Sequence, residues 1–101
     1  MKTFLKLMLV GTSVLMSSHL YAITALNGYK CYALLENNTF AVIDVEIKQK
    51  SKAQAAHAAI AEGHKYPGKE LQRVAEIQQC VRRSEEFSDA NARKLDKMKL
   101  R

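Results

Sequence analysis

The chain has 101 residues and a formal net charge of +6, with 16 basic residues against 10 acidic ones and only two cysteines. A chain of this length is expected to form one small domain, and the absence of an internal repeat argues against a repeat architecture. It contains no tryptophan, and no linker rich in glycine or proline indicates a second domain.

The first 22 residues have the organisation of a secretory signal peptide. Lys2 and Lys6 precede an apolar run at residues 7–16, and a short polar stretch then ends at Ala22. The apolar run is about half the length that a membrane-spanning helix needs. We therefore expect cleavage after Ala22, export to the periplasm, no membrane span after cleavage, and one domain over residues 23–101. Two other cleavage points also fit, after Ser18 and after Ala25.

Both cysteines, Cys31 and Cys80, lie in this expected domain. Small exported domains usually need a covalent link, because their cores are small and their compartment is oxidising. Two cysteines without a third therefore predict one structural disulfide. A reactive thiol would need a CxxC partner or a nearby base, and only Arg82 and Arg83 stand close to Cys80. The bond would close a loop of about 50 residues and contribute roughly 4 kcal/mol of stability.

The next two segments predict a β-hairpin. Residues 27–36 are rich in strand-forming side chains, and residues 39–49 alternate apolar and polar positions. Asn37 and Asn38 stand between them, and asparagine tolerates the left-handed backbone that a tight turn requires. The apolar face of the second strand would consist of Ala41, Ile43, Val45 and Ile47.

An alanine-rich helix is predicted over residues 52–62. Ser51 followed by Gln54 is a capping box, and Gly63 is a preferred helix stop. The side expected to face the hairpin consists of Ala53, Ala56 and Ile60.

The segment that follows contains a turn and then an ambiguous stretch. In HKYPGKE, residues 64–70, proline followed by glycine suits the centre of a type II turn. Over residues 71–82, the spacing of Leu71, Val74, Ile77 and Val81 slightly favours a helix, while alternation also allows a strand. The residues alone leave both structures open.

A short terminal helix is predicted over residues 89–98. Ser88 can cap it, and Phe87 can pack on Ala92 as a hydrophobic staple. Basic side chains gather toward its C-terminal end, where they suit the helix dipole, namely Arg93, Lys94, Lys97 and Lys99.

No pattern in the chain predicts chemistry. His57 and His64 are seven residues apart, but Gly63 interrupts the helix between them and the HExxH spacing is absent. Adjacent acids such as Glu85 and Glu86 rarely converge on one substrate. The sequence therefore predicts no catalytic residue, no metal site and no cofactor, and a protein that is not an enzyme.

Two groups of side chains are candidates for a partner surface. Tyr32 and Phe40 would form an exposed aromatic patch if the outer face of the sheet is uncovered. Arg93, Lys94 and Lys97 form a basic helix face that suits an acidic partner. A nucleic acid is excluded as partner, because export removes it and no stacking aromatics interleave these charges.

The stretches GYKCYALLE and EIQQCVRRSEEFSDANARKLDKMKLR carry a family resemblance. Together they resemble the small exported proteins of the TapY type, which are associated with type IVa pilus and secretion systems. The shared pattern is YKCY at residues 29–32, then Cys80 with Val81, and later positions that end in Leu-Arg. Those later positions are Phe87, Ser88, Ala92, Leu95, Asp96, Leu100 and Arg101.

The resemblance implies a strand over residues 72–82, because members are rich in valine and tyrosine before the second cysteine. Here Gln72, Glu76 and Gln78 depart from that composition. The expected fold is then α+β, in the order strand, strand, helix, strand, helix, with three antiparallel strands, one covering helix and one disulfide.

The resemblance also implies a function without transferring any catalytic residue. It suggests a non-enzymatic periplasmic accessory or adaptor protein that binds a protein of the pilus or secretion apparatus. The alternative is a periplasmic enzyme inhibitor similar to lysozyme inhibitors, or an envelope stress protein. For an inhibitor, the loop at residues 64–70 is the candidate for insertion into an enzyme cleft.

Overall fold

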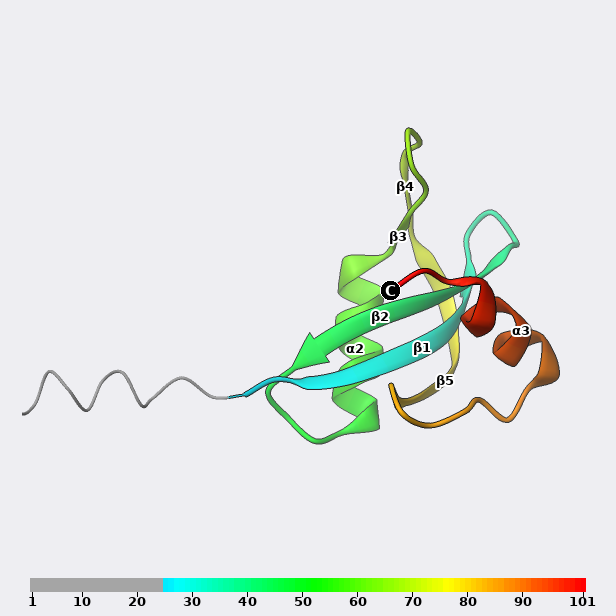
Figure 1. The fold of residues 1–101 in the computed structure, drawn as a ribbon. Helices are drawn as coiled ribbons and strands as arrows, with labels where there is room; N and C mark the ends of the chain where they lie inside the picture. The colour runs from blue at the N-terminus through cyan, green and yellow to red at the C-terminus, as the bar shows by residue number, and fades with distance from the viewer. Residues whose placement is uncertain (1–24) are drawn as a thin grey trace, which may run out of the picture.

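A computed structural model describes residues 25–101, and the expected signal peptide lies outside these described residues. A three-stranded antiparallel sheet has the strand order β2-β1-β5, and β3 and β4 form a separate small hairpin (Figure 1). This arrangement confirms the expected α+β fold. In chain order the elements are β1 (Asn27–Leu35), β2 (Phe40–Ile47), α2 (Lys52–Glu62), β3 (His64–Lys65), β4 (Leu71–Gln72), β5 (Val74–Arg82) and α3 (Ala90–Met98).

The hairpin of β1 and β2 forms where the sequence predicts it. The Asn38 backbone adopts a positive φ of 65°, and its N–H donates to the Leu35 carbonyl at 3.0 Å. The Leu35 N–H donates to the Thr39 carbonyl at 2.8 Å, which closes the end of the ladder. Asparagine tolerates this left-handed conformation, so the turn residue sets the register of the two strands.

The helix α2 has the predicted ends. The Ser51 hydroxyl accepts from the Gln54 N–H at 3.2 Å, and the helix stops at Gly63 with φ of 70°. A Cβ at Gly63 would lie 2.9 Å from the Gln72 carbonyl oxygen, so glycine is required there for two reasons.

The expected inner side of α2, which was Ala53, Ala56 and Ile60, is only partly correct, because Ala56 alone of the three packs against the core cluster. Ala55 and Ala59 are fully buried against the sheet, whereas Ala53 is exposed and Ile60 is 51% exposed. Alanine occurs on almost every side of this helix, so apolar periodicity does not determine which side packs. The packed side carries methyl groups alone, which allow close approach to the strands.

Residues 74–82 form strand β5, so the strand implied by the family resemblance is confirmed. Each strand next to β1 runs antiparallel to it, and Cys80 lies directly opposite Cys31. The small β3–β4 hairpin was not predicted, although its turn was. The Lys69 N–H donates to the Tyr66 carbonyl at 3.0 Å across Pro67 and Gly68.

The sheet is covered on both faces, and only one cover was expected. On one face, α2 packs on a cluster that includes the disulfide. On the other face, Phe87 and Ala92 close over Tyr32, Val42 and Val81. The second cover comes from α3 and the segment before it, which Figure 1 shows beside the strands.

The cap of α3 lies one residue later than expected. The Asp89 carboxylate, rather than the Ser88 hydroxyl, accepts from the Ala92 N–H at 3.0 Å. The Ser88 N–H instead donates to the Gln79 side chain at 3.0 Å, which ties the segment to β5. Phe87 is fully buried in one cluster with Ala92, so the predicted contact forms, but with Asp89 as the cap the two residues no longer occupy the N′ and N4 positions of a hydrophobic staple.

Candidate functional site

The two cysteines form the expected disulfide. Cys31 and Cys80 face each other across β1 and β5 with a Cα–Cα distance of 4.1 Å and an S–S distance of 2.09 Å. Such a short Cα–Cα distance is typical of a pair whose main chains do not bond to each other, because their side chains lie closest there. Both sulfurs are consumed in the bond, so neither serves as a thiol nucleophile or thiolate ligand in this structure.

A chain of charged groups joins α3 and the C-terminal residues to the sheet. The Lys30 ammonium is buried and donates to Asp96 at 2.6 Å. It also lies 5.3 Å from the centre of the Phe87 ring, within the range of a cation–π interaction. Arg101 donates to Asp96 at 2.6 Å and to Asp44 at 2.8 Å and 3.0 Å.

This network shifts the pKa values of Asp96 and Arg101. Burial raises the pKa of the Asp96 carboxyl, but hydrogen bonds from Lys30 and Arg101 outweigh it, so the net pKa lies below the ordinary value. The hydrogen bond to Asp44 raises the pKa of the Arg101 guanidinium above its ordinary value. These groups therefore remain charged and paired at neutral pH.

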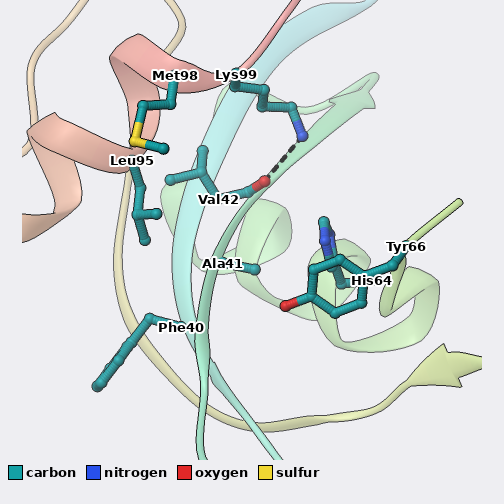
Figure 2. A pocket seen from close by; sticks show the side chains of 8 residues that line it. All are labelled: Phe40, Ala41, Val42, His64, Tyr66, Leu95, Met98 and Lys99. Carbon is teal, nitrogen blue, oxygen red and sulfur yellow. Dashed lines mark hydrogen bonds between the residues drawn. The ribbon is translucent and has the colours of Figure 1, made fainter.

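An apolar groove lies beside this network, at the outer edge of β2. Its volume is about 270 Å³. One wall comes from α3 and the other from the start of the β3–β4 hairpin, with β2 between them (Figure 2). The lining residues are Phe40, Ala41, Val42, His64, Tyr66, Leu95, Met98 and Lys99.

The hairpin wall of the groove is made by two rings. His64 and Tyr66 pack edge to face with their centres 4.5 Å apart. The Tyr66 hydroxyl lies 3.4 Å from the Thr39 hydroxyl, which links the hairpin to the β1–β2 turn. Burial, and secondarily the charge of Lys99, lowers the pKa of the His64 imidazole below its ordinary value. His64 is thus neutral at neutral pH and offers an apolar ring face.

The other wall exposes apolar surface to solvent. Met98 is 72% exposed on α3, and Leu95 beside it is half-buried. The Lys99 side chain extends across the groove, and its ammonium donates to the Val42 carbonyl at 2.9 Å (Figure 2). The groove therefore combines exposed apolar side chains with one positive charge.

The predicted aromatic patch is half wrong. Tyr32 is only 7% exposed, because Phe87 packs on it and the second face of the sheet is covered. Phe40 is 42% exposed and stacks on the Tyr32 ring with a centre distance of 5.0 Å. Of the two residues of the predicted patch, Phe40 presents aromatic surface, and it does so at the groove.

The three residues of the predicted basic surface, Arg93, Lys94 and Lys97, also differ in whether they are free to contact a partner. The Arg93 guanidinium donates to the carbonyls of Phe87 and Ser88 at 2.9 Å and 2.7 Å, so it braces the loop before α3. Lys94 and Lys97 are exposed, and neither forms an ion pair with an acidic side chain among residues 25–101. These two lysines are available to a partner, whereas Arg93 is engaged.

The histidine pair does not converge. His57 is exposed on α2, and His64 packs against Tyr66 at the groove. Within residues 25–101, no three side chains of the metal-binding types gather into a candidate metal site. In the same part of the chain, no helix has the length and apolarity required to cross a membrane.

Sequence reasoning missed most of the groove. The sequence places His64 and Tyr66 in a turn segment, and it gives no indication that Leu95 and Met98 lie at a groove. The weak signal in the sequence is Met98 itself, an apolar residue between Lys97 and Lys99 in the last turn of the predicted helix. The groove arises only when the hairpin and α3 meet across β2.

Comparison with known proteins gives one finding. The family model described as type IVa secretion system protein TapY2-like matches residues 5–101. No curated protein sequence and no solved structure matches the chain.

Proposed function

Because the chain belongs to the TapY2-like family of type IVa secretion system proteins, we propose that it is a non-enzymatic accessory protein that binds a protein of the apparatus in the periplasm. The observation that carries this proposal is the family match over nearly the whole chain. The signal-peptide pattern of residues 1–22 supports the location.

Features of the structure support binding as the mode of action. The sheet is held by a disulfide on one face and by a buried ion pair on the other, so each face has one strong link that stabilises the scaffold. The exposed side chains Phe40 and Met98 lie at one groove, with Lys94 and Lys97 exposed on the helix that forms one wall. Exposed apolar surface rimmed by polar groups is typical of protein-binding sites.

A second candidate function rests on the β3–β4 hairpin. This hairpin stands away from the three-stranded sheet, and Pro67 and Gly68 form its tip (Figure 1). A projecting turn with a fixed backbone suits insertion into an enzyme cleft, as expected of a lysozyme inhibitor. The purified protein would then inhibit lysozyme at stoichiometric concentrations, and a Pro67→Ala, Gly68→Ala variant would lose this inhibition.

The primary proposal is tested by gene deletion. We expect the deletion strain to lose surface pili or secreted substrate, measured by pilus shearing and by quantitative proteomics of the medium. Expression of the full chain should restore the wild-type level, and expression of residues 23–101 without the export segment should not. Unchanged pili and secretion in the deletion strain would contradict the proposal.

A further inference from the structure

The outer edge of β2 presents its main-chain groups to one side in a fixed alternation. Leu35 and Thr39 bond across the hairpin, so every second pair from there bonds between β1 and β2. The residues between these pairs point their N–H and C=O groups away from β1. By this count the outward residues are Phe40, Val42, Asp44 and Glu46.

One side-chain contact confirms this alternation independently. The Val42 carbonyl accepts from the Lys99 ammonium, which requires that it point outward. Within residues 25–101, no further strand pairs with this edge, since β2 is the last strand of the sheet. An open strand edge is a template for an added strand, and a lysine placed on it is a common protection against unwanted pairing.

The groove has the shape that an added strand requires. Side chains of a strand alternate between its two faces, so a strand beside β2 would direct them alternately toward α3 and toward the hairpin. On one side they would meet Leu95 and Met98, and on the other His64 and Tyr66 (Figure 2). Both walls are apolar, so both sets of alternate side chains would find an apolar surface.

The charge around the groove indicates the chemistry of the occupant. Lys30 and Arg101 are neutralised by Asp96 and Asp44. Lys99 lies in the groove and forms no ion pair with an acidic side chain of residues 25–101, and Lys94 and Lys97 are exposed on the same terminal segment. The electrostatic potential around the groove and the C-terminal end of α3 is therefore positive, which favours a carboxylate on the partner.

From these observations we propose that the β2 edge and its groove bind an extended segment of a partner protein by strand addition. The segment carries apolar side chains beside an acidic one. Its main chain pairs with Phe40 and Val42, its apolar side chains occupy the groove walls, and its carboxylate replaces the Val42 carbonyl as the partner of Lys99. This inference rests on the proposed function and names the binding site for it.

The first test uses short peptides with alternating apolar and acidic residues. A phage library of this composition is selected on the purified, oxidised protein, and the best peptide is synthesised with single N-methyl groups at successive residues. Strand addition predicts that every second N-methyl group weakens binding by about tenfold, because only alternate N–H groups face β2. Equal tolerance at all positions, or failure to select any peptide, would overturn the inference.

The second test uses matched variants of the protein. Met98→Glu places a negative charge in the groove at an exposed position, and Ile60→Glu places the same charge at an exposed position on α2. We expect Met98→Glu to weaken peptide binding by about tenfold and Ile60→Glu to leave it unchanged, with equal thermal unfolding of both variants. Equal binding by the two variants would exclude the groove as the site.

Two outcomes separate this inference from the proposed function. If Met98→Glu fully restores pili or secretion to the deletion strain, the groove is not the site, and the accessory function stands. If the deletion has no effect while peptides bind with the alternating pattern, the function fails and the site stands. Sedimentation that shows a dimer abolished by Met98→Glu would make a second copy of the chain the occupant and overturn the proposal.

Discussion

The two faces of the sheet are held by different physical means. On the face toward α2, the contacts are the Cys31–Cys80 bond and close packing of Ala55 and Ala59. On the face toward α3, the aromatic contact of Phe87 with Tyr32 is joined by the buried Lys30 ammonium and its carboxylate partner. The α2 face is stabilised by a covalent bond and apolar packing, whereas the α3 face is stabilised by an aromatic contact and an ion pair.

This difference implies that the α2 face serves mainly to stabilise the fold, whereas the α3 face also contributes to the binding groove. Apolar and covalent contacts depend little on pH, whereas ion pairs require both partners to be charged. The charged face also supplies Leu95, Met98 and Lys99 to the groove. The groove is therefore built partly on the face whose stability depends on solution conditions, which gives four ways to test the comparison.

The largest effect is expected from the disulfide. Replacing Cys31 and Cys80 together by alanine should lower the free energy of unfolding by about 4 kcal/mol, because the bond restricts a long loop in the unfolded chain. Urea unfolding of the oxidised and the double-alanine protein measures this difference. A loss below about 1 kcal/mol would show that apolar packing alone holds the α2 face.

On the other face, Asp96→Asn should cost about 3 kcal/mol, because it leaves the Lys30 ammonium buried without a carboxylate. The double variant Lys30→Met, Asp96→Asn removes both charges and should recover most of this loss. Urea unfolding of Asp96→Asn, Lys30→Met and the double variant gives the coupling energy. Additive losses would show that the two side chains act independently.

Acid should weaken the α3 face specifically. The folded state lowers the pKa of Asp96 below its ordinary value of 3.8, so its contribution is complete above that value and is lost as pH falls through the lower, folded pKa. Between pH 5 and pH 2, the wild type should therefore lose more stability than the double variant Lys30→Met, Asp96→Asn. Parallel loss in both proteins, measured by urea unfolding at each pH, would contradict this assignment.

The smallest effect should be equal on the two faces. Ser51 caps α2 and Asp89 caps α3, each through one hydrogen bond to a backbone N–H. Alanine at either position should cost about 1 kcal/mol. Thermal unfolding of the two variants is the measurement, and a clearly larger loss for Asp89→Ala would show that the α3 face also depends on its cap for closure.

Local signals in the sequence predict most of the fold. The paired asparagines, the Ser51 cap and the proline-glycine turn each act through their neighbours, so their positions can be inferred without the rest of the molecule. Residues 74–82 are different, because apolar spacing allows both helix and strand, and pairing with β1 decides between them. The family resemblance indicates a strand in this segment, which apolar periodicity alone does not decide.

The groove could be predicted only in part. Of the lining residues, sequence reasoning identifies Phe40, because an aromatic side chain marks a candidate surface by its type; Lys94 and Lys97 are exposed on α3 but do not line the groove. Tyr32 was misplaced because its burial depends on Phe87, which is 55 positions away in the sequence. His64 and Tyr66 were missed because nothing local indicates that their hairpin approaches the edge of β2.

The Cys31–Cys80 bond closes residues 31–80 into a covalent ring and leaves the segments before Cys31 and after Cys80 outside it. The ring contains β2, α2 and the projecting hairpin, whereas α3 and the segment before it lie outside the ring. The bond also pins β5 to β1 beside two places where their pairing shifts, so these strands cannot slide past each other. The C-terminal segment, which forms one wall of the groove, is therefore joined to the ring covalently only through Cys80 and otherwise by non-covalent contacts.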